Sequence, residues 1–403
     1  MRHAPIAMDP FLPLARPTLG EAEAEAVRRV LRSGWVSQGP EVAAFEHEFA
    51  AAVGAPHACA VANGTAALEL ALRAVGVVPG DEVITVSHSF VATAASIRHC
   101  GALPVFVDVD PATGNLDPRF IEPAVTSRTR AILCVHQLGM PCDLDAIRRI
   151  AAGRELALVE DAACAVGSEL LWHGQWQPLG RPHGEVACFS FHGRKVLTTG
   201  EGGMLTTADP AIDRRVRRWR DHGVSLPAEA RHASPRVEFE SYAELGFNYR
   251  MSDLQAAVGR EQLRRLPQIV VRRRALAACY GELLGGLGRV TPPGEPVWAR
   301  SNWQSYAVRL ADDLDQREVM QRLLDGGIAT RRGVMCAHRE GAFPAGTWRC
   351  GSGPPGCSGA PGVCRHLWVS EQARDRTILL PLFPEMADED PPRVAAALER
   401  ACR

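Results

Sequence analysis

A lysine between two apolar segments is the first candidate for chemistry in this sequence. Lys195 ends the segment Ser190-Phe-His-Gly-Arg-Lys195, and the glycine-rich stretch Thr198-Thr-Gly-Glu-Gly-Gly203 follows it. A lysine that is desolvated in such a setting can form a Schiff base with an aldehyde. Ser190 can bind a phosphate of the same ligand. The alternative interpretation is a lysine that only contacts a phosphate.

Two further patterns indicate the same kind of ligand. The run Leu158-Val-Glu-Asp161 ends a predicted buried strand on an acidic residue, at the sheet edge where open α/β folds bind ligands. A buried carboxylate needs a cation or hydrogen-bond donors, although Asp161 could instead cap a helix. At Asn63-Gly64-Thr65-Ala66 a strand gives way to a helix, whose first amides can hold a phosphate. Any tight strand–helix turn has this last pattern.

A phosphate site, a carboxylate and an imine-forming lysine together describe a site for pyridoxal 5′-phosphate (PLP). The carboxylate would keep the pyridine nitrogen protonated, so that the ring withdraws electrons. Lys195 would carry the aldehyde and, once released, act as general base. Phe90, which follows Ser87-His-Ser89 at a strand–helix junction, can stack on the ring. The alternative for Phe90 is a core residue that starts a helix.

An alternation of strands and helices must position these residues. Short apolar segments predict strands at 58–62, 82–86, 103–109, 131–136, 156–160, 187–191 and 203–207. Helical patterns occupy 19–33, 65–75, 90–100 and 144–152. This order predicts an α/β fold with a mainly parallel sheet. Helices are expected to dominate 211–287, followed by a smaller α+β part with a strand at 305–310 and a helix at 316–324.

Composition excludes several classes of protein. The 403 residues are 46% hydrophobic and 23% charged, which suits a globular chain of about two to three domains. The 45 Lys and Arg balance the 46 Asp and Glu, so nothing draws the whole chain to nucleic acid or anionic lipid. We expect no membrane span and no signal peptide. Single cysteines in apolar segments, such as Cys59 and Cys188, suit reduced thiols in the cytoplasm.

An arginine-rich stretch and a cysteine-rich segment also stand out, but neither predicts a binding site. The arginines at 260, 264, 265, 272, 273 and 274 are typical of a solvated helix face or of subunit contacts, rather than of nucleic-acid binding. The Gly- and Pro-rich segment 345–363 predicts an irregular loop. Cys350 and Cys357 lie in it and Cys364 follows it directly, so the three recur every seven residues. His366 is near, but zinc sites usually take paired ligands about two to four residues apart, so we expect no metal.

From Leu14 to Met386 the sequence resembles the DegT/StrS family of PLP-dependent sugar aminotransferases, which have the aspartate-aminotransferase fold (fold type I). The matching segments are Ser33–Pro40, Asn63–Leu68, Gly80–Ile84, Phe106–Asp110, Glu160–Ala163, Ser190–Lys195, Thr199–Gly203 and Gly246–Ser252. The resemblance implies an N-terminal arm over 1–20 and a large PLP-binding α/β domain over 21–265. That domain would contain a mainly parallel seven-stranded sheet flanked by helices, and 266–403 would form a small α+β domain.

The resemblance also implies roles for single residues. Lys195 would be the Schiff-base lysine, Asp161 would pair with the pyridinium nitrogen and Phe90 would stack on the ring. The remaining cofactor-binding residues would be Gly64, Thr65, Ala66, Cys164, Ser190 and, from the partner subunit, Asn248. A shared contact of this kind implies a homodimer with shared active sites. Cys164 replaces the Gln or His that many members have near the cofactor's phenolic oxygen.

The implied reaction is transamination, because relatives that act as sugar 3-dehydratases have His in place of the lysine. An amino acid, expected to be L-glutamate, would convert PLP to pyridoxamine phosphate, which would aminate a nucleotide-linked keto-sugar. Tyr306, Arg331 and His338 lie in family-like segments near the expected substrate site, with core packing or surface ion pairing as alternatives. A PLP enzyme that acts on a cyclitol or dehydrates its substrate, and a PLP-binding regulatory protein, are the other hypotheses.

Overall fold

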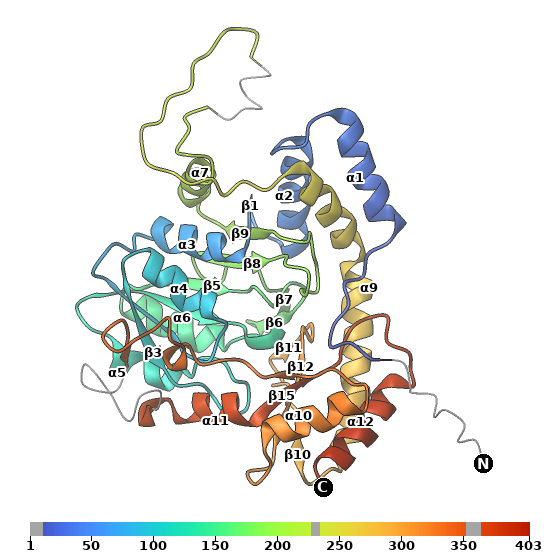
Figure 1. Ribbon diagram of the computed structural model, residues 1–403. Helices are drawn as coiled ribbons and strands as arrows, with labels where there is room; N and C mark the ends of the chain where they lie inside the picture. Colours follow the sequence, from blue (N-terminus) through green and yellow to red (C-terminus); the bar gives the residue numbers. More distant parts are fainter. Residues whose placement is uncertain (1–10, 227–233, 352–363) are drawn as a thin grey trace.

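A large sheet with helices on both faces forms the centre of the molecule, and smaller sheets and helices lie at one end of it (Figure 1). The computed structural model describes residues 11–226, 234–351 and 364–403. The first ten residues of the expected N-terminal arm and Cys357 lie outside this part. The α/β fold predicted from the alternating segments is confirmed.

The large sheet has eight strands within the described residues. Their order is β1 (His57–Val61), β9 (Gly203–Thr207), β8 (Val186–Ser190), β5 (Ala157–Asp161), β4 (Thr129–Val135), β2 (Glu82–Val86), β3 (Leu103–Val107) and β14 (Arg349–Cys350). Only β9 runs antiparallel to its neighbours among these described strands. The mainly parallel sheet is therefore confirmed, but it has one strand more than expected.

The additional strand, β14, lies in the segment for which composition predicted an irregular loop. Arg349 and Cys350 pair in parallel with β3. The Arg349 guanidinium also lies 2.6 Å from the carboxylate of Glu82, whose side chain is fully buried. The ion pair reaches past β3 to the first residue of β2, and it holds the two residues of β14 at the edge of the sheet. The loop prediction, which rested on the local Gly and Pro content, was therefore wrong for these two residues.

Successive strand residues point to opposite faces of the sheet, and both faces are covered. In β1, Ala58 and Ala60 belong to one apolar core, while Cys59 and Val61 belong to the other. Such strands, buried on both faces, read as continuous apolar runs. The first face packs against α2 (Pro40–Val53), α5 (Ile121–Ala124), α6 (Leu144–Gly153) and α9 (Asp253–Leu284). The second packs against α3 (Gly64–Ala74), α4 (Val91–His99) and α7 (Pro210–Trp219).

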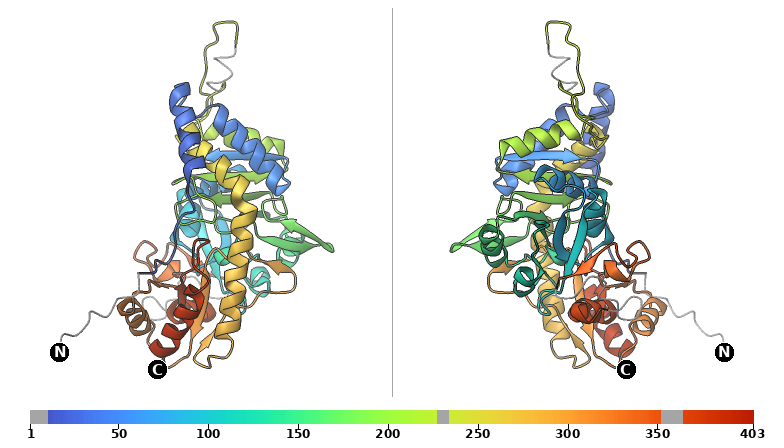
Figure 2. Two further views of the ribbon diagram at one scale, coloured as in Figure 1. Left: turned by 90° about the vertical axis from the view of Figure 1, so that its right-hand side faces the viewer. Right: turned by 90° about the vertical axis from the view of Figure 1, so that its left-hand side faces the viewer.

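The long helix α9 connects the two parts of the molecule (Figure 2). Leu263 and Leu266 pack in the core of the large sheet, whereas Leu276 and Tyr280 pack in the C-terminal core. The expected domain boundary at 265/266 thus falls within this helix. α1 (Glu21–Ser33) packs along the outside of α9.

The basic stretch of α9 is paired within the chain. The partners are Glu41 and Glu48 for Arg260, Glu261 for Arg264, Glu23 for Arg265, Asp388 for Arg272, the Leu382 carbonyl for Arg273 and Glu169 for Arg274. Apart from the pair within the helix, Arg264 with Glu261, these contacts attach α9 to α1, α2, β6 and the C-terminal part.

The C-terminal part contains an antiparallel sheet. Its order is β10 (Val290–Thr291), β12 (Tyr306–Leu310), β15 (Thr377–Leu380) and β13 (Arg331–Arg332), with α10 (Gln316–Asp325), α11 (Trp368–Arg376) and α12 (Asp390–Ala401) around it. A third sheet joins β11 (Ala299–Arg300) to the hairpin of β6 (Glu169–Trp172) and β7 (Gln175–Pro178). The predicted strand at 305–310 and helix at 316–324 are both present.

Helices do not dominate the whole of 211–287. The described residues between α7 and α9 instead pair with one another, through bridges such as Asp221–Asn248. The Phe247 amide donates to the Trp219 carbonyl at 2.7 Å, so the backbone here satisfies its hydrogen bonds across the segment rather than within a helix. Among the described residues, no helix combines the length and apolarity needed to cross a bilayer.

Candidate active site

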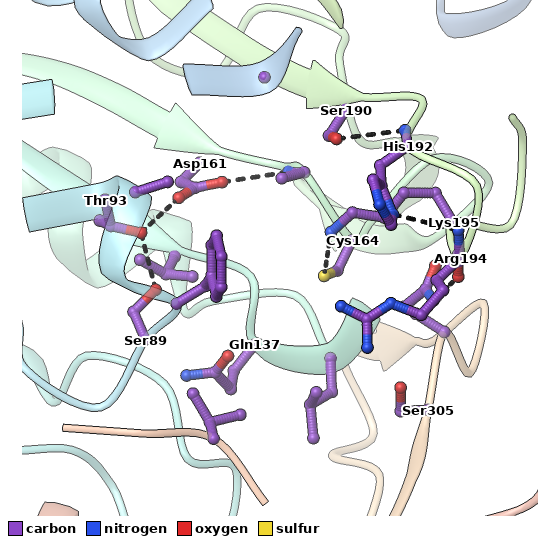
Figure 3. Close-up of a pocket in the computed structure, with 18 of the residues that line it drawn as sticks. Ser89, Thr93, Gln137, Asp161, Cys164, Ser190, His192, Arg194, Lys195 and Ser305 are labelled. Atoms are coloured by element: carbon purple, nitrogen blue, oxygen red, sulfur yellow. Dashed lines mark hydrogen bonds between the residues drawn. The ribbon is translucent and has the colours of Figure 1, made fainter. Parts of the chain in front are cut away.

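A cavity of about 690 Å³ lies at the carboxyl ends of β2, β4, β5 and β8 (Figure 3). This is the edge at which open α/β sheets bind ligands. Eight of the nine predicted cofactor residues line it: Gly64, Thr65, Ala66, Phe90, Asp161, Cys164, Ser190 and Lys195. They come from distant parts of the sequence because the parallel strands end side by side.

Asp161 is the last residue of β5, and its side chain is 5% exposed. Its carboxylate accepts hydrogen bonds from the Thr93 hydroxyl at 2.7 Å and from the Ala163 amide at 3.2 Å. Burial raises the pKa of Asp161, although these two donors and the positive charge of Lys195 oppose the shift. A carboxylate held in this way favours a cationic partner in the cavity, such as a protonated ring nitrogen.

Thr93 is a residue that the sequence analysis missed. Its hydroxyl lies between Asp161 and the Ser89 hydroxyl, which is 2.7 Å away, and it belongs to α4, 68 residues before Asp161. Both hydroxyls are buried. Nothing in the local pattern of α4 distinguishes Thr93 from a residue that packs against the sheet.

Lys195 is held in a turn that follows β8. Its ammonium group donates to the Cys164 sulfur at 3.0 Å, and its amide donates to the His192 carbonyl at 2.8 Å. Gln304, from the C-terminal part, fixes the residues on both sides of the lysine. Its side chain accepts from the Val196 amide at 2.9 Å and donates to the Arg194 carbonyl at 2.7 Å. Gln304 is more than a hundred residues away in the sequence, and no local pattern indicates its role.

The sequence contains a signal for Lys195 that local patterns do not use. Lys195 is the only lysine among the 403 residues, and every other cationic side chain of this kind is arginine. Arginine can replace lysine wherever a positive charge is enough, as in the ion pairs of α9. It cannot provide a neutral primary amine at neutral pH, because its guanidinium stays protonated. The single lysine therefore stands where an amine is required.

The N-terminus of α3 also borders the cavity. Asn63 caps the helix by accepting from the Ala66 amide at 2.9 Å, so any ligand must share that amide. Ser190, at the end of β8, packs directly on this turn. A methyl group on Gly64 would lie 2.8 Å from the Ser190 β-carbon, which explains the glycine. The helix dipole, the Thr65 hydroxyl and Ser190 together favour an anionic group here.

Phe90 caps α4 beside Asp161 and leaves 58% of its surface exposed in the cavity. An exposed aromatic ring gains free energy when a flat ligand covers it. The aromatic ring, the carboxylate, the amine and the anion-binding helix end fit PLP, whose ring nitrogen, aldehyde and phosphate are at separate corners of one planar molecule.

Of the three predicted substrate residues, only Arg331 lines the cavity. Arg331 is exposed and lines the cavity. Tyr306 is 1% exposed and packs against Tyr280 and Trp303, with ring centroids 5.0 and 5.5 Å apart, so it belongs to the C-terminal core. His338 is buried away from the cavity. Neither Tyr306 nor His338 lines the cavity, and the alternative of core packing describes where the structure places both.

His338 connects the C-terminal part to the end of β2. Its Nδ1 lies 2.6 Å from the Ser87 hydroxyl, and its Nε2 lies 2.9 Å from the Glu371 carboxylate. The Ser87 hydroxyl also accepts from the His338 amide at 3.1 Å. This chain of bonds holds the segment that leads to Phe90, so His338 supports the cavity wall from behind.

Asn248 does not line the cavity, and its side chain is exposed. The described cysteines Cys350 and Cys364 are buried, and no cluster of metal-ligating side chains occurs among the described residues.

Acid is expected to destabilise the fold through His88, which follows β2. Its ring is 5% exposed, neither ring nitrogen has a well-formed hydrogen bond with the described residues, and burial lowers its pKa to about 4. Below about pH 6.5 His88 becomes protonated in the unfolded chain but stays neutral in the folded chain. The free energy of unfolding therefore falls as the pH drops toward 4.

The expected loss between pH 7 and pH 5 is about 2 kcal/mol, given about 1.4 kcal/mol per pKa unit. Urea unfolding of the wild type and of His88→Asn at both pH values measures it. The variant should lose less stability than the wild type by this amount, and an identical loss in both would contradict the assignment.

Known proteins resemble this chain over nearly its whole length. The model of the DegT/DnrJ/EryC1/StrS aminotransferase family matches residues 17–399. The aminotransferase TlmJ from Streptoalloteichus hindustanus is 34% identical, with 97% of this chain and 98% of that chain covered and a TM-score of 0.84. DesI, solved in the presence of its TDP-sugar product, is 32% identical, with 99% and 95% covered and a TM-score of 0.82.

A third structure concerns the cofactor. The sugar aminotransferase Spr1654 from Streptococcus pneumoniae is 26% identical in its PMP form, with 97% of this chain and 99% of that chain covered and a TM-score of 0.87. It is also solved in a PLP form. The family match over nearly the whole chain, together with the only lysine facing a buried aspartate, leads to one assignment: this chain belongs to the DegT/DnrJ/EryC1/StrS aminotransferase family and is a PLP-dependent transaminase.

Proposed function

We propose that this enzyme transfers an amino group from L-glutamate to a nucleotide-linked keto-sugar in amino-sugar biosynthesis, with pyridoxamine phosphate as the carrier form. The observation that carries the proposal is the placement of Lys195 and Asp161 on one cavity that the N-terminus of α3 also borders. The relative DesI, which has a TDP-sugar product, supports the class of acceptor.

The roles of the side chains follow from their chemistry. When bound, PLP supplies an aldehyde that accepts amines and a ring that withdraws electrons. We assign the cofactor aldehyde to the Lys195 amine in the resting enzyme. Once released, the same nitrogen would be the base that moves the proton of the donor's α carbon. Asp161 would keep the ring nitrogen protonated, and Ser190 and Thr65 would hold the phosphate.

The rest of the cavity suits an anionic substrate. Arg194 and Arg331 line it and are exposed, and Arg332 joins them from β13. Guanidinium groups bind phosphate oxygens in pairs, as the diphosphate of a nucleotide-sugar requires. Leu14 and Ala15, from the described part of the N-terminal arm, border the same space.

A homodimer with shared active sites is part of the proposal. Asn248 is exposed and lies outside its own subunit's cavity, which suits a contact with the cofactor of a second copy. The preceding residues Val237, Phe239 and Leu245 expose 87, 90 and 96% of their surfaces. Exposed apolar groups favour burial against another chain. The buried cysteines suit a cytoplasmic location.

The reaction is tested with the purified holoenzyme. Adding L-glutamate should bleach the visible cofactor band and release 2-oxoglutarate, and adding a nucleotide-linked keto-sugar should restore the band. A panel that includes free keto-sugars and keto-cyclitols separates the acceptor classes. Turnover with keto-cyclitols alone would refute the nucleotide-sugar assignment, and failure to form 2-oxoglutarate would refute the donor.

The shared site is tested by mixing two inactive variants, Lys195→Ala and Asn248→Ala. If Asn248 acts on the partner's cofactor, each mixed dimer contains one site with both native side chains. Random mixing should then restore about a quarter of the wild-type activity, since half the dimers are mixed and one of their two sites is intact. If Asn248 acts within its own subunit, mixing restores nothing.

A further inference from the structure

Cys164 is unusual among the cysteines of this chain. Of the cysteines that the structure describes, only Cys164 and Cys279 are not buried. Cys164 lines the cavity, so a small polar reagent that enters the cavity reaches its sulfur. The others, such as Cys59 and Cys188, lie inside the apolar cores of the sheet.

The sulfur of Cys164 and the amine of Lys195 face each other. Their separation is 3.0 Å, and the lysine is the donor (Figure 3). An amine at this distance can attack the sulfur once the sulfur has been oxidised. The roles proposed above for amino transfer leave this sulfur without a step in the reaction.

Side chains of the C-terminal part fix the backbone of both Cys164 and Lys195. The Cys164 carbonyl accepts from the Asn302 side chain at 2.9 Å, and that amide also donates to the Val166 carbonyl at 2.8 Å. The turn of Lys195 is fixed by Gln304, two residues after Asn302. Because one short segment of the C-terminal part anchors both backbones, nitrogen and sulfur stay close without a rearrangement of the chain.

We propose that Cys164 and Lys195 form a reversible, oxidant-driven nitrogen–sulfur cross-link. A peroxide transfers one oxygen atom to the Cys164 sulfur, so that the sulfur is oxidised to a sulfenic acid and the peroxide is reduced to water or an alcohol. The Lys195 amine then attacks the sulfur. The nitrogen–sulfur bond forms, the sulfur–oxygen bond breaks, and the hydroxyl group leaves as water with a proton from nitrogen.

Overall, the protein loses two hydrogen atoms. Two equivalents of a thiol reverse the reaction: the first cleaves the nitrogen–sulfur bond and the second releases Cys164 as the thiol, with a disulfide as the oxidised product. While the bond exists, the only lysine amine of the chain cannot react with an aldehyde. PLP bound to Lys195 occupies that amine and protects it, so the cofactor-free enzyme is the sensitive form.

The test uses cofactor-free protein treated with hydrogen peroxide, blocked with an alkylating reagent and digested with trypsin and a glutamate-specific protease. These enzymes leave Cys164 in the peptide 161–169 and Cys188 in 186–194. Trypsin cuts after a free Lys195 and leaves 196–201, but it does not cut after a lysine whose amine is blocked, so a cross-linked Lys195 stays in 195–201. The expected product joins 161–169 to 195–201 with the loss of two hydrogen atoms. It should disappear after dithiothreitol and be absent when PLP is bound before the peroxide.

Two matched variants complete the experiment. Cys164→Ser should abolish the product, whereas Cys279→Ser, at the other partly exposed cysteine, should leave it unchanged. Joining of 161–169 to 186–194 would show a disulfide with Cys188, and a sulfinic acid on Cys164 beside an unmodified Lys195 would show simple oxidation. Either result overturns the proposal. Because mass is measured on cofactor-free protein, the outcome does not depend on the amino-sugar reaction.

Discussion

Replacing Lys195 by alanine is expected to lower the rate of amino transfer by about 10⁴-fold or more, because the variant loses both the amine that holds the cofactor and the base that moves the proton. Steady-state release of 2-oxoglutarate from L-glutamate measures the effect. The carboxylate of Asp161 and the N-terminus of α3 remain, so the variant should still bind PLP, but without a covalent bond.

Lys195→Arg is the matched control. It keeps the positive charge and most of the length of the side chain, but its guanidinium does not condense with an aldehyde. Both variants should therefore be inactive, whereas Cys279→Ser should match the wild type. Wild-type activity in Lys195→Arg would mean that charge alone is needed.

Borohydride gives an independent measurement for this residue. Reduction of the holoenzyme should fix a pyridoxyl group on the peptide that contains Lys195. Because the chain has no other lysine, the remaining place for such a label is the α-amino group of the N-terminus. A label on the N-terminal amino group, with none on Lys195, would refute the proposed role of this lysine.

Replacing Asp161 by alanine is expected to have the second largest effect. Its buried carboxylate would pair with the protonated ring nitrogen, and breaking a buried charge pair costs about 3–5 kcal/mol. This range corresponds to a loss of roughly 200- to 5,000-fold in cofactor affinity and rate combined. Titration with PLP followed by absorbance measures affinity, and single turnover with L-glutamate measures the proton-transfer step.

Thr93→Val separates the charge of Asp161 from its orientation. This variant keeps the carboxylate but removes the hydroxyl that lies 2.7 Å from it. The expected loss is about 1.5–3 kcal/mol, because one hydrogen bond to a charged group is removed. If Thr93→Val were as damaging as Asp161→Ala, or if Asp161→Ala were active, the carboxylate would not be the partner of the ring nitrogen.

The chemistry of the site is encoded locally. Lys195 and Ser190 lie within one short segment, as do Asn63 and Thr65, so contiguous patterns identify them. The strands of the large sheet are equally local, because a strand buried on both faces must be a short apolar run between polar turns. For this reason the α/β fold and eight cavity-lining residues could be predicted before the structure.

Tertiary structure decided which side chains meet those residues. Thr93 reaches Asp161 from a helix, Gln304 fixes the lysine turn from the C-terminal part, and Arg349 adds a strand to the sheet by pairing with Glu82. Each contact joins segments that are far apart in sequence. Its formation depends on the path of the whole chain, which local composition does not describe.

The same reason explains why two of the three predicted substrate residues do not line the cavity. Tyr306 and His338 lie in segments whose pattern resembles a substrate-binding region, but the small sheet turns Tyr306 into its own core and Ser87 binds His338 behind the cavity wall. The sequence by itself determined the type of chemistry and the order of the elements, since both depend on neighbouring residues. Only the folded chain decided burial and long-range partners, which depend on how those elements pack.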